Sequence, residues 1–150
     1  MTECVLVDID GTLADCSHRI KFVQGARKDW KTFFRLDLVS RDRLIEPVAK
    51  TVLSLDSSGY SIIYVSGRNE ALRETTEEWL ARHGLWINPY QLFMRADGDY
   101  RSDVEVKSEL LDMIREEGWK PFLAIDDRSS VVSMWRSSGL VCLQAAEGDF

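Results

Sequence analysis

Two pairs of aspartates stand where predicted strands end: Asp8 with Asp10 early in the chain, and Asp126 with Asp127 near its end. The carboxyl ends of neighbouring parallel strands share one edge of a sheet, and ligands bind in the crevice there. At an effective dielectric near 20, two like charges about 4 Å apart repel by on the order of 4 kcal/mol. The four carboxylates therefore need a cation or protons. Oxygen ligands of high charge density favour Mg²⁺.

The first pair has the composition of a nucleophile beside an acid. Asp8 and Asp10 lie two residues apart, so on a continued strand both side chains point to the same face, and Gly11 then allows a sharp turn. A carboxylate facing a bound phosphate can attack it, while a neighbouring carboxyl group protonates the leaving oxygen. Taken alone, an Asp-x-Asp sequence is more often turn or capping chemistry.

Two further segments could hold a phosphate. Ser66 and the backbone N–H groups of Gly67 and Arg68 are predicted to precede a helix, where an anion is favoured. Lys107, near the start of another predicted helix, would supply positive charge to a transferring phosphoryl group. Singly, these residues could be a plain turn and a solvated lysine, and the second aspartate pair could be a helix cap. Their shared position at strand ends and helix starts favours phosphoryl transfer through an aspartyl-phosphate.

Such a site needs a mostly parallel sheet covered by helices on both faces. Near-continuous apolar runs are typical of strands buried on both sides, and here they alternate with amphipathic stretches that stop at a glycine. The predicted strands are 3–8, 60–65, 90–94, 121–125 and 140–143, and the predicted helices are 47–58, 69–83, 104–117 and 129–138. The fold class is therefore α/β.

Length and composition suit one globular domain over 1–150, because the chain has 150 residues of which 45% are hydrophobic and 29% charged. Its apolar runs fall far short of the roughly 20 residues of a membrane span, and its start lacks the basic region of a signal peptide. The three cysteines form no CxxC pair, so neither a disulfide framework nor a zinc site is expected. We expect a soluble, cytoplasmic protein without membrane contacts.

Residues 13–46 interrupt the alternation of strands and helices. Between Arg19 and Arg43 there are eight basic and three acidic residues, a charge of +5, so the net charge of −6 leaves −11 for the remainder. The negative net charge of the whole chain argues against non-specific electrostatic binding of nucleic acid over its whole surface. The segment has enough apolar residues for two short helices. We predict a small, basic helical insertion, or cap, over one edge of the sheet.

This insertion has two interpretations. Its basic residues are interleaved with the aromatic residues Phe22, Trp30, Phe33 and Phe34. Together they could follow a phosphate backbone and stack on bases. Alternatively, the aromatic rings pack on the sheet while the charges face water. His18 and Arg19, early in the segment, could reach a substrate phosphate, although a histidine there is more often only a surface residue.

The motifs resemble those of the haloacid dehalogenase superfamily of phosphotransferases. Asp8-Ile9-Asp10-Gly11-Thr12-Leu13 is similar to its first motif, Ser66 to its second, Lys107 to its third and Asp126-Asp127 to its fourth. The resemblance implies a three-layer α/β/α Rossmann-like fold with a small helical insertion after the first strand. Within the superfamily the chain is more similar to the 3′-phosphatase domain of phage polynucleotide kinase. The residues that carry this likeness are Val65-Ser66-Gly67-Arg68, Arg95, Gly98, Asp99, Arg101, Asp103, Lys107, Ala124-Ile125-Asp126-Asp127-Arg128, Val131-Val132, Met134-Trp135-Arg136 and Gly148-Asp149-Phe150.

The resemblance implies a role for each matching residue. Asp8 would be the nucleophile, and Asp10 would act first as general acid and then as base. Ser66 and Lys107 would hold the phosphate. The implied Mg²⁺ ligands are Asp8, Asp10 through its backbone carbonyl, and Asp126. The implied substrate-binding residues are Thr12, Gly67, Arg68, Arg95 and Arg101, with His18 and Arg19 from the insertion, and the supporting residues are Asp127, Asp99 and Asp103.

The expected function is a Mg²⁺-dependent phosphatase that removes 3′-terminal phosphate from polynucleotide or nucleotide ends in nucleic-acid repair, in the host cytoplasm if the chain is phage-encoded. No glycine is followed by Lys and Ser or Thr, so we expect no kinase activity from this chain. A separate kinase or ligase could act as its partner.

Two alternative functions are considered. One alternative, favoured by the negative net charge, is a phosphatase of free mononucleotides or other small phosphomonoesters. The other is a non-catalytic nucleic-acid-binding module, which has no need of a nucleophile beside an acid.

Overall fold

A five-stranded parallel sheet forms the centre of the computed structural model, which describes residues 2–87 and 91–150. The strands lie in the order β5-β4-β1-β6-β7, so β1 is in the middle. Their bounds are Thr2–Val7 for β1, Ser61–Asn69 for β4, Leu92–Arg95 for β5, Trp119–Asp126 for β6 and Val141–Gln144 for β7. Position 90 of the predicted strand 90–94 lies outside the described residues.

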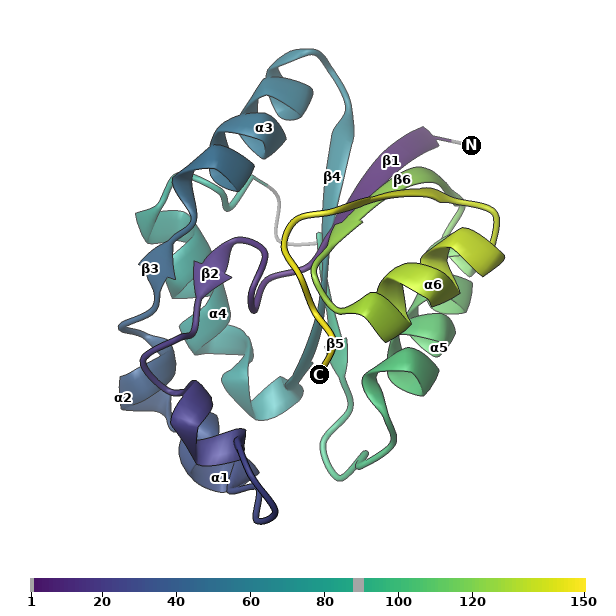
Figure 1. The fold of residues 1–150 in the computed structure, drawn as a ribbon. Helices are drawn as coiled ribbons and strands as arrows, with labels where there is room; N and C mark the ends of the chain where they lie inside the picture. The colour runs from purple at the N-terminus through teal and green to yellow at the C-terminus, as the bar shows by residue number, and fades with distance from the viewer. Residues whose placement is uncertain (1, 88–90) are drawn as a thin grey trace.

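Helices cover both faces of the sheet (Figure 1). On one face lie α3 (Glu46–Ser57) and α4 (Arg73–Arg82), and on the other lie α5 (Asp103–Glu116) and α6 (Ser129–Ser137). Alternate residues of β1 point to opposite faces: Val5 packs in the core under α3 and α4, and Leu6 in the core under α5 and α6. The predicted three-layer α/β/α fold is confirmed. No helix among the described residues is both long and apolar enough to span a bilayer.

Local signals place the helices within a few residues of their predicted bounds. Pro47 stands in the first turn of α3, where a missing N–H is tolerated. At the start of α5, the Ser102 side chain accepts the Glu105 N–H and the Glu105 side chain accepts the Ser102 N–H. The helix predicted at 69–83 is instead a short 3₁₀ turn, η2 (Glu70–Leu72), followed by α4.

The strand predicted at 60–65 is longer than expected. β4 runs on to Asn69, so Ser66, Gly67 and Arg68 are extended strand and not the turn before a helix. The interpretation of their N–H groups as a helix N-terminus was therefore wrong. The physical reason is pairing with β5, in which Ser66 lies opposite Met94 and Asn69 opposite Arg95. A β-carbon on Gly67 would lie 2.6 Å from an oxygen of Asp103, and the Arg68 side chain is drawn into buried ion pairs.

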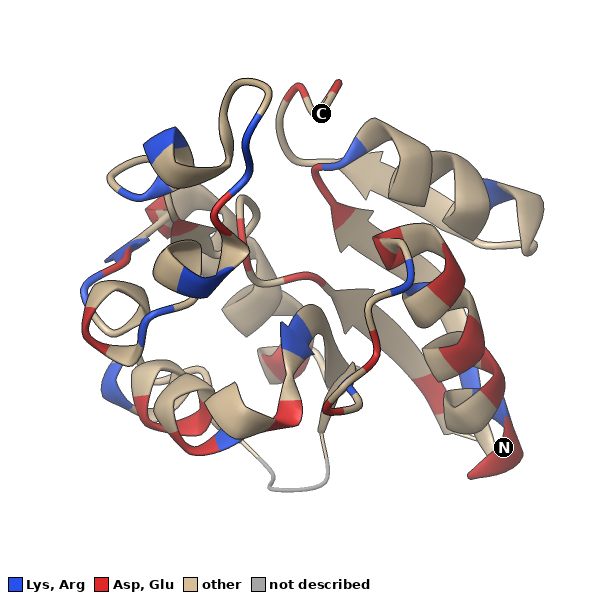
Figure 2. Cartoon of the chain, turned by 90° about the horizontal axis from the view of Figure 1, so that it is seen from below, with Lys and Arg blue, Asp and Glu red and all other residues tan. Residues whose placement is uncertain are grey.

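Residues 13–46 form the predicted insertion, with a small second sheet that the sequence did not predict. Its elements are β2 (Ala14–Asp15), η1 (Ile20–Val23), α1 (Trp30–Phe33), α2 (Leu36–Val39) and β3 (Arg43–Leu44). β2 and β3 pair antiparallel, and the Ile45 N–H donates to the Leu13 carbonyl at 2.7 Å, so the two ends of the insertion are joined. Two-residue strands are too short for a period-2 pattern to reveal. Basic positions gather on the side of the molecule that the insertion forms (Figure 2).

Tyr64 carries a buried hydrogen bond that joins β4 to the segment after α4. Its hydroxyl donates to the Leu85 carbonyl at 2.6 Å. Tyr64→Phe leaves that carbonyl without its donor, so we expect a loss of about 1–3 kcal/mol in the free energy of unfolding, measured by urea denaturation. Tyr60→Phe is the matched control because Tyr60 is 41% exposed. Equal losses in the two variants would show that the bond is not the cause.

Candidate active site

Three carboxylates meet at the carboxyl ends of β1 and β6. Asp8 follows β1 directly, Asp126 is the last residue of β6, and Asp127 comes next. The strands are neighbours in the sheet, and Val7 is level with Ile125, which sets Asp8 beside Asp126. One oxygen from each of the three carboxylates lies within 4.8 Å of the others, and all three residues are buried. We call Asp8, Asp126 and Asp127 the acidic cluster.

Lys107 links two members of the acidic cluster. It comes from α5 and is 2% exposed, and its Nζ donates to Asp8 Oδ1 at 2.7 Å and to Asp126 Oδ2 at 2.8 Å. Burial alone would lower the pKa of Lys107, but Asp126 and Asp8 outweigh it and hold the pKa above its ordinary value. The lysine is therefore charged. These contacts use two of the three N–H donors of an ammonium, which leaves one for an oxygen of a substrate.

One ammonium does not balance the acidic cluster. Burial and the charge of Asp126 raise the pKa of Asp8 well above its usual range, although Lys107 opposes them. The same two causes raise the pKa of Asp127 to about 6. A set of carboxylate oxygens with excess negative charge fits a hard divalent cation such as Mg²⁺. Among the described side chains, the carboxylate that joins those of Asp8 and Asp126 is that of Asp127, which was predicted as a supporting residue. The predicted contribution of Asp10 is its backbone carbonyl and not its carboxylate.

The turn after the first motif supports the acidic cluster. Gly11 has a φ of +81°, and a β-carbon there would lie 2.1 Å from Asp127 Oδ2. The buried Thr12 hydroxyl donates to Asp8 Oδ2 at 2.9 Å and lies 3.4 Å from Asp127 Oδ1. Only glycine suits the turn. Thr12 was predicted to contact the substrate. In the structure its hydroxyl positions the carboxylates of Asp8 and Asp127.

Asp10 points to two arginines. Its carboxylate accepts bonds from Arg68 Nη2 at 2.6 Å, Arg68 Nε at 3.1 Å and Arg19 Nη2 at 2.7 Å. Burial alone would raise the pKa of Asp10, but Arg68 and Arg19 lower it to about 2. Asp10 is thus ionised. Ser66, buried on β4, accepts the Arg68 N–H at 3.1 Å through its hydroxyl oxygen.

Asp42, from the insertion, completes this network and was not predicted. Its Oδ2 accepts from Arg19 Nη2 at 2.6 Å and from Arg68 Nη2 at 3.3 Å, and the His18 Nε2 lies 2.7 Å from its Oδ1. Two arginines share the carboxylates of Asp10 and Asp42, so these buried charges compensate one another. Arg19, predicted to bind a phosphate, is enclosed in this network, and the His18 side chain is 37% exposed beside it. The sequence offers no spacing signal for Asp42.

Two of the four aromatic residues of the insertion, Phe33 and Phe34, pack against other parts of the protein. Phe33 is buried, and the Arg19 guanidinium carbon lies 4.3 Å from its ring centroid. Phe34 packs against the main core, and Trp30 stacks on Phe34 with ring centroids 6.0 Å apart. Trp30 is nevertheless 44% exposed. The interpretation that the rings pack on the sheet therefore holds for Phe34, whereas Phe33 is buried against Arg19 and Phe34 within the insertion, and Trp30 keeps an accessible ring.

A cavity of about 430 Å³ extends from the acidic cluster to the insertion. Gly11 and Asp127 line one part of it, and Trp30 and Lys28 line another. The cavity offers a path for the part of a substrate that lies beyond its phosphate. An exposed aromatic ring beside a lysine suits a nucleoside, because rings stack on bases and ammonium groups attract phosphates.

Arg95 holds the loop before α5. It donates to the Gly67 carbonyl at 2.8 Å and to Asp103 Oδ1 at 2.6 Å, and its Nη1 donates to the carbonyls of Asp99 and Arg101. Asp99 and Arg101 pair with each other at 2.7 Å. Among the described contacts, none joins Arg95, Asp99 or Arg101 to the acidic cluster. These three residues therefore stabilise the loop at 96–102, which leads into α5 and so to Lys107.

Arg128, which was not among the predicted site residues, ties this loop to the last residues of the chain. Its Nη1 donates to Asp103 Oδ2 at 2.9 Å, and its Nε donates to the Phe150 carbonyl at 2.9 Å. The Gly148 carbonyl accepts the Ser129 N–H, and a β-carbon on Gly148 would lie 2.0 Å from the Asp127 carbonyl oxygen. The segment at 148–150 therefore packs directly against Asp127 and Arg128, at the end of the acidic cluster.

Known proteins share this fold. A putative phosphatase from Clostridium difficile superposes with a TM-score of 0.69 at 16% identity, over 99% of this chain and 88% of its own. The parallel sheet with aspartates at its strand ends has the architecture of the haloacid dehalogenase type of fold. More narrowly, the family model of the polynucleotide kinase PNKP phosphatase domain matches residues 2–150, and the chain belongs to this family.

Two relatives are longer than this chain. A chain in the structure of a Pnkp1/Rnl/Hen1 complex is 33% identical, with a TM-score of 0.83 over 100% of this chain and 47% of its own length. A putative bifunctional polynucleotide kinase/RNA ligase of Autographa californica nuclear polyhedrosis virus is 26% identical over 132 residues, which are 88% of this chain and 17% of the viral protein. The chain thus spans less than half of either relative.

The acidic cluster predicts that Mg²⁺ stabilises the fold. A cation that binds only the folded state at 100 times its Kd adds about 2.7 kcal/mol to the free energy of unfolding. Thermal unfolding of EDTA-treated protein with and without Mg²⁺ measures the effect. Asp126→Asn should reduce the Mg²⁺-dependent rise in Tm, whereas Asp112→Asn, at an exposed position of α5, should keep it. If Mg²⁺ leaves the Tm of the parent unchanged, the cluster does not bind it.

Proposed function

We propose that this chain is a Mg²⁺-dependent phosphatase that removes a 3′-terminal phosphate from polynucleotide or nucleotide ends. The observation that carries the proposal is the contact of 2.7 Å between the Asp8 carboxylate and the Lys107 ammonium within the acidic cluster. Membership of the PNKP phosphatase domain family supports a polynucleotide substrate. So does the likeness to a chain of a structure described as an RNA repair complex.

Asp8 is the nucleophile in the proposed reaction. One of its carboxylate oxygens forms a bond to phosphorus while the bond between phosphorus and the sugar oxygen breaks, which leaves an aspartyl-phosphate. Thr12 and Lys107 orient the carboxylate, and the remaining N–H of Lys107 holds a phosphoryl oxygen. Mg²⁺ held by Asp8, Asp126 and Asp127 would offset the negative charge of the phosphoryl group. The backbone carbonyl of Asp10 is proposed as a further ligand.

Asp10 carries the proton in both steps. First it protonates the leaving sugar oxygen, and then it takes a proton from the water that attacks the aspartyl-phosphate, which releases inorganic phosphate and restores Asp8. Arg68 and Arg19 keep the pKa of Asp10 low, at about 2, before substrate arrives. A phosphate anion beside Asp10 opposes the two arginines and raises this pKa, which favours the protonated acid that the first step needs.

The chain is also proposed to work beside a kinase or ligase activity carried elsewhere. The viral relative is named for both activities, and this chain matches 17% of it. The alternative of a phosphatase for free mononucleotides draws on the net charge of −6. The basic insertion and the cavity between Asp127 and Trp30 favour the polynucleotide.

Turnover of a panel of phosphate esters with Mg²⁺ tests the proposed substrate. We expect kcat/KM to be highest for a 3′-phosphorylated oligonucleotide, lower for a 3′-mononucleotide and lowest for a 5′-mononucleotide. The physical reason is that a 3′-mononucleotide can place its nucleoside in the cavity, whereas only the oligonucleotide also extends beyond it along the basic insertion. A strong preference for 5′-mononucleotides would overturn the proposal.

Asp8→Asn and Asp10→Asn test the two carboxylate roles. Asp8→Asn should lower kcat by about 10³-fold or more for every substrate, while circular dichroism shows a folded protein. Asp10→Asn should cost about 10²–10⁴-fold for a 3′-phosphorylated nucleotide and less for p-nitrophenyl phosphate, whose leaving group needs no proton. Full activity of Asp8→Asn would exclude the aspartyl-phosphate, and equal losses of Asp10→Asn on both substrates would exclude its role as acid.

A further inference from the structure

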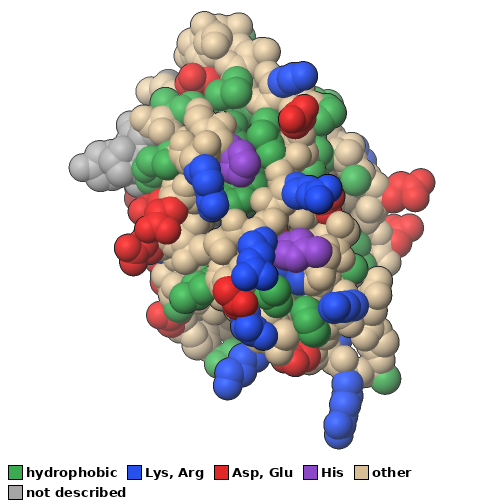
Figure 3. Space-filling model, turned by 90° about the vertical axis from the view of Figure 1, so that its left-hand side faces the viewer, with side chains coloured by type: hydrophobic (Ala, Val, Ile, Leu, Met, Phe, Trp, Pro, Cys, Tyr) green, Lys and Arg blue, Asp and Glu red, His purple; other side chains and the backbone are tan. Residues whose placement is uncertain are grey.

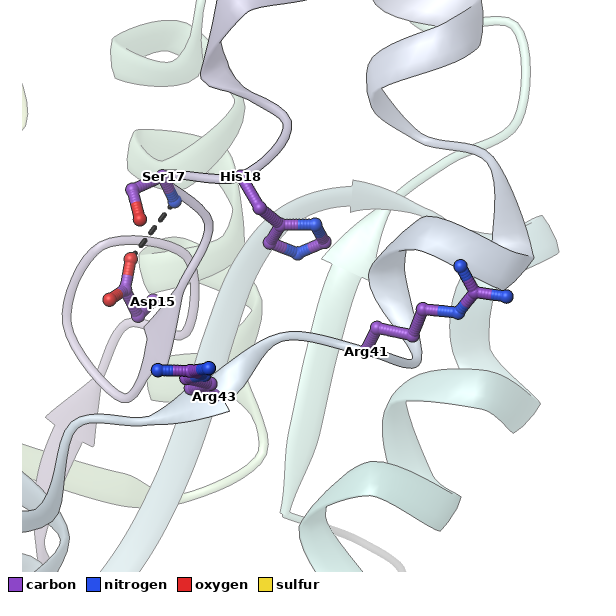
Figure 4. A pocket seen from close by; sticks show the side chains of 5 residues that line it. All are labelled: Asp15, Ser17, His18, Arg41 and Arg43. Atoms are coloured by element: carbon purple, nitrogen blue, oxygen red, sulfur yellow. Dashed lines mark hydrogen bonds between the residues drawn. The ribbon is translucent and has the colours of Figure 1, made fainter.

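A second hollow lies on the surface of the insertion. It has a volume of about 410 Å³ and is lined by Asp15, Ser17, His18, Arg41 and Arg43. Figure 4 shows the His18 ring projecting between Arg43 on one side and Arg41 on the other. None of these residues belongs to the acidic cluster, and the proposed reaction uses none of them at the phosphorus atom.

The hollow is positively charged. Within residues 2–87 and 91–150, neither Arg41 nor Arg43 has an ion-pair partner, in contrast to the enclosed Arg19 and Arg68. Asp15 is the only acidic residue of the lining, and its carboxylate accepts the Ser17 N–H at 2.9 Å. Lys and Arg side chains also gather around a histidine on this face of the molecule (Figure 3). A chain with a net charge of −6 thus presents a local site for an anion.

Asp42 fixes the backbone from which the two arginines project. Its carboxylate is buried against Arg19, and its backbone carbonyl accepts the Trp79 Nε1 hydrogen at 2.9 Å. Arg41 and Arg43 stand on either side of this anchored residue and are exposed, while His18 contacts the Asp42 carboxylate directly. The three basic groups therefore stand on a rigid support. Such a support reduces the entropy lost when they bind a ligand.

The hollow adjoins the cavity that begins at the acidic cluster. Asp15 and Ser17 line both of them, and the cavity continues from there to Gly11 and Asp127. A strand whose end lies at Asp127 and whose next nucleotide fills the cavity reaches the hollow when it crosses the segment at 15–17. The chemistry along this path is that of a polynucleotide: a terminal phosphate, a nucleoside and a further phosphate.

We propose that Arg41 and Arg43, together with His18, bind an internal phosphate of the strand whose 3′-terminal phosphate lies at the acidic cluster. The inference rests on the proposed function and names its substrate class, a single strand of several nucleotides. Guanidinium groups match phosphate oxygens with two parallel N–H bonds, which suits the phosphodiesters of both DNA and RNA.

Steady-state kinetics on 3′-phosphorylated DNA and RNA of increasing length, from one nucleotide to eight, test this site. For the parent, kcat/KM should rise with length and level off once the strand reaches the hollow. The double variant Arg41→Gln/Arg43→Gln should lose about 10-fold on the longest strand relative to the mononucleotide, as expected for two exposed charge-assisted contacts. The slope of log kcat/KM against log salt concentration should become shallower by about 1 for each arginine.

Two further variants sharpen the test. Arg115→Gln/Lys120→Gln removes the same charge at exposed positions on α5 and β6, and should keep the length dependence of the parent. Asp15→Asn removes the one carboxylate in the hollow while keeping an oxygen for the Ser17 N–H, and should steepen the length dependence. Thermal unfolding confirms that each variant is folded.

The outcomes separate the two proposals. A parent that hydrolyses neither p-nitrophenyl phosphate nor any 3′-phosphate refutes the proposed function. A parent that hydrolyses 3′-phosphates without a length dependence, or an Arg41→Gln/Arg43→Gln variant that keeps the parent's length dependence and salt slope, refutes the internal phosphate site alone. The latter result is also expected if the hollow binds an acidic protein segment.

Discussion

The ion pair that Lys107 makes with Asp8 and Asp126 is the interaction on which the rest of the site depends. Three buried carboxylates repel one another strongly in a medium of low dielectric, and a buried charge without a partner costs several kcal/mol. The ammonium must therefore reach the strand ends. For that reason α5 has to start at a defined place, which the Ser102 cap, Arg95 and Asp103 secure. The pair also leaves negative charge in excess, so the same residues that need the lysine fit a divalent cation.

A second charge network gives Asp10 an environment unlike that of Asp8. Arg19 comes from the insertion and Arg68 from β4, and both bond Asp10 and Asp42. The insertion is thus joined to the sheet by buried ion pairs as well as by apolar packing. Two carboxylates only two positions apart in the chain have their pKa values moved in opposite directions, up for Asp8 and down for Asp10. Such a division is how neighbouring carboxylates come to do different work in one site.

Particular residues show where prediction from the sequence succeeds and where it stops. The buried strands were predictable because a central parallel strand must be apolar along its whole length, and the aspartates follow such runs. The end of β4 was not predictable, because a serine and a glycine after an apolar run are typical of a turn, whereas here pairing with β5 continues to Asn69, opposite Arg95, and keeps the chain extended. Asp42 was missed for a related reason. Its partner Arg68 is 26 residues away, and no local pattern marks the pair.

The sequence by itself determined the α/β class, the parallel sheet and the set of strand-end aspartates, because these follow from apolar runs, glycine stops and the spacing of a few motif residues. Only the tertiary structure decided which cation meets which carboxylate. Lys107 and Asp8 are 99 residues apart, and Arg68 and Asp10 are 58 apart, so their contacts depend on how the strands are ordered and how α5 packs. The same holds for the place of the Asp127 carboxylate beside those of Asp8 and Asp126. Displacements of a few ångströms decide whether a carboxylate faces a lysine, an arginine or another carboxylate. Local sequence patterns do not specify distances of that size between residues that are far apart in the chain.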